Sequence, residues 1–263
     1  DGSTATIPLS KALFMHFTGL GAGEAAQQVQ HNTTSEAYNR IGEREIDINL
    51  IFVTPPSADE IDMARINDVE LELVPIAKDA LVIINNRENP VESLTQEQIR
   101  AIYRNDITNW QEVGGENTEI LAYQRSLYSG SQTLFLQLVM DGSEPAQPDT
   151  ETLVGTMDYL VDAISSYKNA RNALGYSMYY YVNGMYGSEM LRIMAVDGIT
   201  PGKHTISSDM YPYCTYYYAV LRADLPDDAP ERALVAFVLS EEGQRTVSDS
   251  GYVPLYPVED EGK

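Results

Sequence analysis

Short segments rich in strand-forming residues alternate with helical patterns along this chain. Several of the helical patterns are about 10 to 15 residues long, which is typical of βαβ units built around a mainly parallel sheet. The segments that favour strands are 46–53, 71–75, 80–84, 120–124, 173–181, 192–196 and 213–221. The alternation therefore predicts an α/β fold with a mainly parallel sheet.

Two helices have clear start signals. Ser57 is followed three residues later by Glu60, and Thr95 is followed by Gln98, so that each pair predicts a capping box at the first turn of a helix. Further helices are expected over 132–140, 156–167 and 231–248, and a loop over 198–208.

Charge and length limit the kinds of partner. The 263 residues carry 39 acidic against 17 basic side chains, a formal charge of -22, which disfavours binding to nucleic acid or to an anionic membrane. The apolar runs are far shorter than the roughly 20 residues of a membrane helix. The length is sufficient for two domains of roughly 100 to 150 residues, or for one large one.

Metal and catalytic signatures are missing from the sequence. One cysteine, Cys214, and three histidines form no spacing typical of a metal site. Neither a P-loop nor a Gly-x-Ser-x-Gly elbow occurs, and we expect no cofactor and no enzyme activity. His31 precedes Asn32 and can border a ligand cleft, although a lone histidine is more often structural.

Three segments place small hydroxyl residues at expected helix starts: 2–8 (GSTATIP), 32–36 (NTTSE) and 129–132 (SGSQ). Free N–H groups and hydroxyls at a helix N-terminus favour an anion, yet each segment alone also fits an ordinary N-cap. Arg125 lies four residues before Ser129 and would add a full positive charge. A surface salt bridge is the alternative for Arg125 in a chain so rich in carboxylates.

Several motifs together resemble the phosphate-binding proteins of bacterial ABC transporters, and the likeness covers nearly the whole chain. They are Thr6-Ile7-Pro8, Val53-Thr54-Pro55, 73–76 (LVPI), 102–110 (IYRNDITNW), 125–131 (RSLYSGS), 174–176 (LGY) and 240–244 (SEEGQ). The resemblance implies a two-lobed type II periplasmic-binding-protein fold, with mixed sheets, flanking helices and a hinge of two crossings. We expect lobe I to comprise 1–84 with 212–263, and lobe II to comprise 85–211.

The same resemblance implies a ligand set without metal. Matched position by position, it assigns anion binding to Thr6, Ile7, Thr34, Thr54, Arg125, Ser129, Gly130 and Ser131. Two positions depart from the family pattern: Thr54 and Leu127 stand where phosphate binders commonly carry Asp. In the family those carboxylates accept a hydrogen bond from protonated phosphate and reject sulfate, so their loss relaxes the expected discrimination between the two anions. Phosphate is the expected ligand, with another oxyanion such as sulfate or a small acidic metabolite as the alternative.

The resemblance further implies a monomer that delivers its ligand to an ABC transporter permease. It implies an extracytoplasmic location, as a lipoprotein on the outer face of a bacterial membrane. No signal for export or lipid attachment occurs in these 263 residues. A sensory or partner-binding protein on the same fold is the competing hypothesis.

Overall fold

The computed structural model describes residues 1–165, 170–185 and 188–258 of the chain. The chain forms two compact units, of which unit 1 comprises Asp1–Asp79 with Tyr216–Lys263 and unit 2 comprises Ala80–Thr215. The chain passes between them within strands β2 (Leu71–Asn86) and β10 (Cys214–Arg222). The sequence-based lobe boundaries, 84/85 and 211/212, lie a few residues from these crossings.

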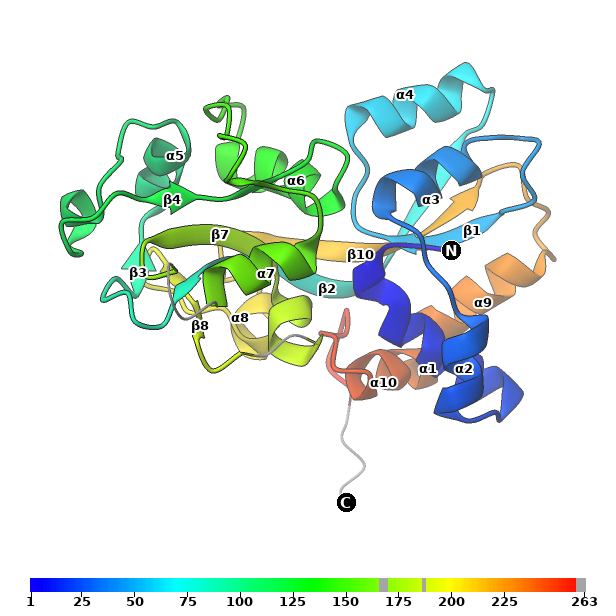
Figure 1. Ribbon diagram of the computed structural model, residues 1–263. Coiled ribbons are helices and arrows are strands. Elements are labelled where there is room, and N and C mark those ends of the chain that lie inside the picture. Colours follow the sequence, from blue (N-terminus) through cyan, green and yellow to red (C-terminus); the bar gives the residue numbers. More distant parts are fainter. Residues whose placement is uncertain (166–169, 186–187, 259–263) are drawn as a thin grey trace. The chain divides into compact units, whose positions relative to one another are not determined.

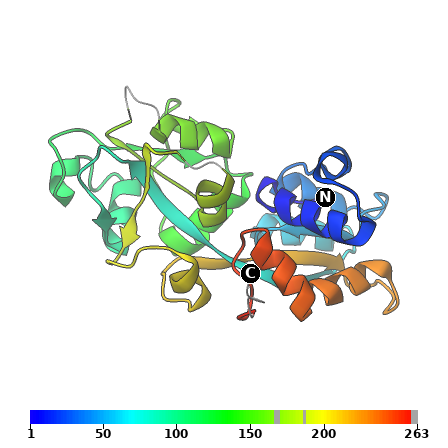
Figure 2. The same cartoon turned by 90° about the horizontal axis from the view of Figure 1, so that it is seen from below.

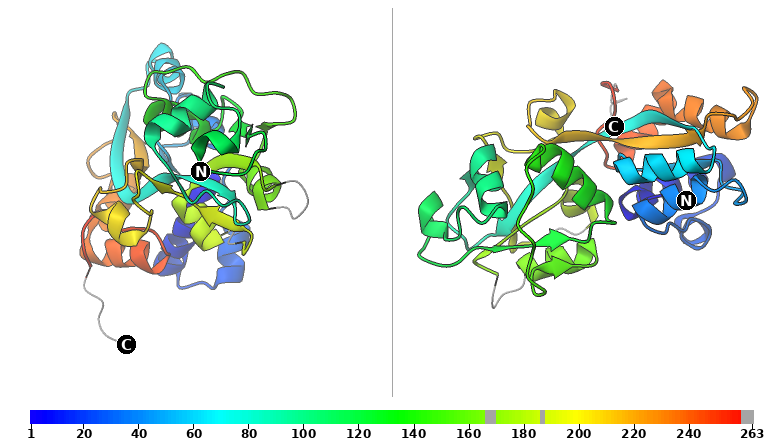
Figure 3. Two further views of the ribbon diagram at one scale, coloured as in Figure 1. Left: turned by 90° about the vertical axis from the view of Figure 1, so that its left-hand side faces the viewer. Right: turned by 90° about the horizontal axis from the view of Figure 1, so that it is seen from above.

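Unit 1 packs helices against strand β1, which pairs antiparallel with β10 through Leu50↔Leu221 and Val53↔Tyr218. In Figure 1, α3 and α4 lie on one side of these strands and α1, α9 and α10 on the other. Figure 2 shows α1, α9 and α10 side by side, and the right-hand view of Figure 3 shows α3 beside α4. The elements are η1 (Thr4–Thr6), α1 (Ile7–Thr18), α2 (Ala22–Gln28), α3 (Thr34–Ile41), β1 (Leu50–Val53), α4 (Ala58–Ile66), α9 (Pro230–Leu239) and α10 (Glu241–Asp249).

The core of unit 1 forms where α3 meets β1 and β10. β1 contributes two alternate residues, β10 contributes Val220, and α3 contributes one apolar face, as its spacing of apolar residues predicts. The fully or almost fully buried residues are Ala37, Tyr38, Ile41, Ile51, Val53 and Val220. This packing fixes the end of β1, where Thr54 follows.

Unit 2 is built around β7, which pairs antiparallel with β2 through Leu81↔Met178 and parallel with β4 through Leu121↔Ala173. Figure 1 shows α5 and α6 on one side of β7 and α7 on the other. The elements are β3 (Ser93–Leu94), α5 (Gln96–Tyr103), η2 (Trp110–Val113), β4 (Leu121–Ala122), β5 (Gln124–Arg125), α6 (Gly130–Leu134), η3 (Phe135–Met140), β6 (Leu153–Val154), α7 (Met157–Ser165), β7 (Ala173–Met178), η4 (Tyr181–Met185), β8 (Leu191–Ile193), β9 (Ala195–Val196) and α8 (Lys203–Ser207).

Aromatic packing anchors α6 and η3 to β7. The rings of Phe135 and Tyr176 stack with centroids 4.4 Å apart, and Tyr103 of α5 meets Phe135 edge-on at 4.5 Å. All three side chains are buried. The turn between Arg125 and α6 is thereby held against a rigid apolar core.

The α/β class and the mixed sheets that the resemblance implies are confirmed, whereas the mainly parallel sheet predicted from the alternation alone is wrong. β1 pairs antiparallel with β10, and β2 pairs antiparallel with both β7 and β8. Parallel pairing joins β4 to β7, β3 to β9 and β5 to β6. The alternation of strands and helices locates the strands but not their partners, and β1 pairs with a strand from the far end of the chain.

Both capping boxes are confirmed: Glu60 N–H donates to Ser57 Oγ and Gln98 N–H donates to Thr95 Oγ1. The single helix expected over 231–248 is instead two, since Ser240 is extended and caps α10. Gly243 permits this break, because a Cβ there would lie 2.6 Å from Val238 Cα.

Other boundaries shift. The strand expected over 46–53 begins at Leu50, the segments 71–75 and 80–84 belong to the one strand β2, and the loop expected over 198–208 contains α8. The helix expected over 132–140 starts earlier, at Gly130, and its second half is the π-helix η3. Of the helix expected over 156–167, α7 ends at Ser165, and the last two residues lie outside the described part.

Candidate anion-binding site

Arg125 of unit 2 lies at the end of β5, beside Val154 of β6. Its guanidinium Nη1 donates to Ser131 Oγ at 3.2 Å, and Nη2 donates to the carbonyl of Gly155 at 3.0 Å. The structure therefore brings the charge of Arg125 to the serine-rich start of α6.

Ser129, Gly130 and Ser131 form that helix start. Ser129 is the N-cap: its Oγ accepts a hydrogen bond from the Gln132 N–H at 3.2 Å, and it lies 3.0 Å from Ser131 Oγ. Both serine side chains are buried. Two hydroxyls and one guanidinium are thus joined in a single hydrogen-bonded group.

Gln132 bonds both to Ser129 and to the backbone of Arg125, a role that the sequence did not indicate. Its Oε1 accepts hydrogen bonds from the Arg125 N–H at 3.1 Å and from the Tyr176 hydroxyl, and its Nε2 lies 3.4 Å from Gln124 Oε1. Tyr176 also accepts from the Arg125 N–H, at 2.9 Å. The backbone of Arg125 is therefore fixed by two buried side chains from α6 and β7.

The positive charge of Arg125 is not neutralised by an ion pair among the described residues. Its Nε is buried and has no hydrogen-bond partner in the described part of the chain. Burial lowers the pKa of the guanidinium, and Tyr176, Tyr181 and Asp158 act in the opposite direction. A half-buried cation with one unpartnered N–H donor favours an incoming anion.

Thr6 of unit 1 is fully buried at the start of α1. Its Oγ1 lies 2.7 Å from the Phe52 carbonyl and 2.9 Å from the Ser3 carbonyl, so the hydroxyl proton is engaged by the backbone. The Ile7 N–H likewise donates to the Thr4 carbonyl. These contacts tie the segment that contains Thr6 to the end of β1.

Thr34 and Thr54 carry the other two threonine hydroxyls that the sequence resemblance assigns to anion binding. Thr34 is the first residue of α3, while its neighbour Thr33 caps that helix by accepting from the Glu36 N–H at 3.2 Å. Thr54 follows β1 and is buried, and its Oγ1 has no partner among the described residues. A buried hydroxyl without a partner costs free energy and is suited to bind a ligand atom.

Helix α3 reaches Thr54 through Tyr38, whose hydroxyl donates to the Thr54 carbonyl at 2.9 Å. Nearby, burial raises the pKa of Glu60, while hydrogen bonds from Ser57 and Ser35 partly oppose that rise. The segments of Thr6, Thr34 and Thr54 are therefore linked within unit 1, and Arg125, Ser129, Gly130 and Ser131 lie together in unit 2.

Leu127, in the turn after Arg125, is 72% exposed, and its neighbour Tyr128 is 80% exposed. Neither side chain supplies a carboxylate to accept a hydrogen bond from a protonated ligand. The turn therefore combines one half-buried cation with exposed apolar side chains.

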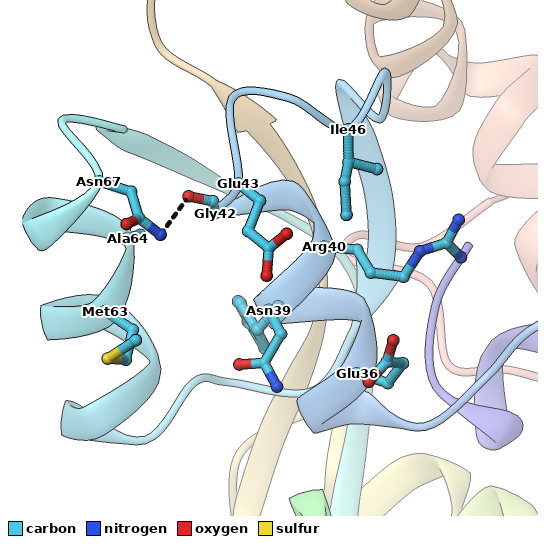
Figure 4. Close-up of a pocket in the computed structure, with 10 residues that line it drawn as sticks. Glu36, Asn39, Arg40, Gly42, Glu43, Ile46, Met63, Ala64 and Asn67 are labelled. Atoms are coloured by element: carbon cyan, nitrogen blue, oxygen red, sulfur yellow. Dashed lines mark hydrogen bonds between the residues drawn. The ribbon is translucent and has the colours of Figure 1, made fainter.

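A pocket of about 410 Å³ lies between α3 and α4 in unit 1 (Figure 4). The Asn67 amide donates to the Gly42 carbonyl there at 3.0 Å. Arg40, on its wall, is paired with Asp1 at 2.5 Å, and Glu36 and Glu43 are acidic. The predicted ligand residues are not among those that line it, and its charges do not favour an anion.

The described part of the chain comprises residues 1–165, 170–185 and 188–258. Within them, His, Cys, Asp and Glu side chains form no group of three or more that could hold a metal ion. In those same ranges no helix has the length and apolar character needed to cross a membrane.

The chain belongs to the PBP superfamily, because the model of the PBP superfamily domain matches residues 2–242. It is 25% identical, over 97% of its length, to the phosphate-binding protein PstS of Bacillus subtilis (strain 168), of which it covers 79%. It is 24% identical to the PstS of Borreliella burgdorferi, covering 97% of this chain and 88% of that protein.

Solved structures confirm the type II periplasmic-binding-protein fold. A Clostridium perfringens protein assigned as a phosphate ABC transporter substrate-binding protein, solved with bound phosphate, has a TM-score of 0.74 at 22% identity, covering 97% of this chain and 98% of that one. An ABC-type phosphate transport receptor from Vibrio cholerae has a TM-score of 0.69 at 20% identity, covering 96% and 97%.

Proposed function

We propose that this protein is an extracytoplasmic solute-binding protein that captures inorganic phosphate for an ABC transporter. The observation that carries the proposal is Arg125, a half-buried cation without an ion-pair partner among the described residues, whose buried Nε has no hydrogen-bond partner there and whose Nη1 donates to the hydroxyl of Ser131. A fully charged guanidinium with adjacent hydroxyl donors matches the oxygens of a tetrahedral anion.

The ligand set of the proposal has two parts. Unit 2 supplies Arg125, Ser129, Gly130 and Ser131. Unit 1 supplies the segment of Thr6 and Ile7, the hydroxyl of Thr34 and the unpartnered hydroxyl of Thr54. Phosphate would favour a closed state by binding ligands from both lobes, as in a hinge mechanism.

Thr54 replaces a carboxylate acceptor in this proposal. A hydroxyl both donates and accepts, so Thr54 accommodates a protonated phosphate oxygen as well as an unprotonated one. Without a carboxylate there, a fully ionised anion meets less repulsion, and we expect weaker discrimination against sulfate.

The cellular setting is also part of the proposal. Relatives named as phosphate-binding proteins, and a structural neighbour named as a phosphate transport receptor, support a role in transport. We accordingly propose a monomer that acts without catalysis, is held as a lipoprotein on the outer face of the cell membrane, and docks on a permease.

The test is calorimetric titration of ligand-stripped protein with phosphate and with sulfate, at about pH 6 and about pH 8, on either side of the second ionisation of phosphate. Phosphate binding that is lost in Arg125→Ala supports the proposal. The matched control is Arg104→Ala, since Arg104 lies in the same unit but is paired with Glu97 and Asp106.

The two anions separate the alternatives. Comparable binding of phosphate and sulfate would identify the relaxed oxyanion site expected here, and rejection of sulfate would contradict the expected loss of discrimination. Binding of neither would overturn the proposal and favour a different small ligand or a sensory role on the same fold.

A further inference from the structure

His31 lies in unit 1 against the segment that carries Thr6. Its Nδ1 is 2.8 Å from the Ser3 carbonyl oxygen and 3.3 Å from Thr6 Oγ1. A carbonyl oxygen only accepts hydrogen bonds, so Nδ1 carries the proton in this contact. In the neutral ring, Nε2 is then the unprotonated nitrogen.

The Ser3 carbonyl oxygen is the hydrogen-bond acceptor that the residues of this segment share. It accepts from the Thr6 N–H at 3.0 Å and from Thr6 Oγ1 at 2.9 Å, in addition to His31. Gly2 packs so closely that a Cβ there would lie 3.0 Å from His31 Nδ1 and 2.1 Å from the Phe52 carbonyl. The imidazole is therefore packed tightly against this segment.

We propose that His31 is a positioning residue that makes anion binding depend on pH. It holds the Ser3 carbonyl through Nδ1–H in both protonation states, and on protonation it adds one positive charge beside the bound anion. This inference rests on the proposed function, because it takes the segment of Thr6 to be part of the phosphate site.

The charges around His31 set its protonation. Burial lowers its pKa, the hydrogen bond with the Ser3 carbonyl raises it, and the positive charges of the amino group of Asp1 and of Lys11 in α1 lower it further. The Asp1 carboxylate, which binds the backbone and side chain of the adjacent Asn32, is itself paired with Arg40. His31 is therefore neutral near pH 7 in the free protein, and a bound anion favours its protonation.

The sign of the effect follows from linkage. Because bound phosphate stabilises the protonated imidazole, the pKa of His31 rises on binding, and binding takes up protons as the pH falls toward that pKa. Affinity in the wild type should therefore gain at acidic pH relative to a variant that cannot be protonated.

The variant for this test is His31→Asn, whose side-chain amide N–H replaces the Nδ1 donor but does not titrate. Phosphate dissociation constants of both proteins are measured from about pH 8 to about pH 5. Their ratio cancels the ionisation of phosphate itself. We expect the ratio of variant to wild type to rise about threefold or more toward low pH, as one partly screened charge would produce.

Two controls make the outcome specific. His16→Asn, on the same helix as Lys11, should leave the ratio flat. In the wild type, the NMR titration of the His31 ring should show a higher pKa with phosphate than without it, which needs no variant to fold. A flat ratio for His31→Asn, or an unchanged His31 pKa, with phosphate still bound, would overturn this inference alone. Loss of phosphate binding by the wild type at every pH would overturn the proposed function.

Discussion

In unit 2 the proposed ligand side chains are bonded to one another, whereas in unit 1 the hydroxyl of Thr6 is bonded to the backbone. Arg125, which is half-buried, donates to the buried Ser131, and Ser131 lies beside the buried Ser129. Thr6 contacts the carbonyls of Ser3 and Phe52. Both units place hydroxyl residues at helix starts, but the Ser131 hydroxyl of unit 2 contacts a cation and that of Thr6 contacts the backbone.

Among the proposed ligand residues, the full charge therefore lies in unit 2 and the hydroxyl fixed by backbone hydrogen bonds lies in unit 1. Unit 2 supplies a cation held in place by Gln132 and Tyr176. Unit 1 supplies a segment fixed by its own hydrogen bonds, with the unpartnered hydroxyl of Thr54 close by in sequence to Phe52. Substitutions in unit 2 should therefore affect affinity first, and some substitutions in unit 1 should affect stability first.

The largest expected effect is that of Arg125→Ala on phosphate affinity. Removing the full countercharge of a buried anion should weaken binding about 100-fold or more, which is about 3 kcal/mol. Calorimetry measures it, and thermal unfolding without ligand checks that the fold persists. A loss no greater than that of a single serine hydroxyl would contradict the division of roles between the units.

Thr6→Val should act on stability instead. The change removes a hydroxyl that contacts two carbonyls, and we expect it to lower the free energy of unfolding by about 1–2 kcal/mol. Denaturant unfolding measures this change. Thr6→Ser retains the hydroxyl and should recover most of the loss. Full stability in Thr6→Val would show that these contacts do not hold the segment.

Thr54→Val sharpens the contrast within unit 1. Its Oγ1 has no partner among the described residues, so removal should leave the free energy of unfolding unchanged or slightly higher. Phosphate affinity should fall about tenfold, because one hydrogen bond to the anion is lost. Reduced stability with unchanged affinity would assign Thr54 a structural role.

Glu60→Gln should give the smallest effect, and only in its dependence on pH. Burial raises the pKa of Glu60 in the folded state, so the folded protein favours the protonated carboxyl. The resulting contribution to the free energy of unfolding is fully present below the unfolded pKa and is lost as the pH rises through the folded pKa. The variant lacks this loss and still offers an oxygen to the Ser57 N–H. Its stability relative to wild type should therefore increase between about pH 4 and about pH 7.

The outcome is read from urea midpoints at several pH values. Ser57→Ala, which removes the cap but leaves the carboxyl in place, is the comparison variant. Parallel curves for Glu60→Gln and the wild type would show that the carboxyl titrates as it does in the unfolded chain.

Local signals predicted local structure well. Ser57 with Glu60, and Thr95 with Gln98, begin α4 and α5 as the spacing predicts. Ser129 caps α6 in the turn where Arg125 and the serines are adjacent in sequence. A hydrogen bond between residues three positions apart depends on the backbone of one turn, so a short window of sequence contains the information.

Other parts of the fold and of the candidate site could not be predicted from a short window of sequence. The direction of the strands required the pairing of β1 with β10, and the helix expected over 231–248 breaks where Gly243 meets Val238. Neither contact has a periodic signature.

The sequence by itself determined the α/β class, the strong acidity, the main helix starts, and the turn that brings Arg125 next to Ser129 and Ser131. Only the tertiary structure decided that Tyr176 and Gln132 hold the backbone of Arg125, and that His31 bonds the Ser3 carbonyl. Those contacts join residues that are far apart in the chain. Their geometry follows from how helices and strands pack, because side chains from distant segments meet only after the core has formed.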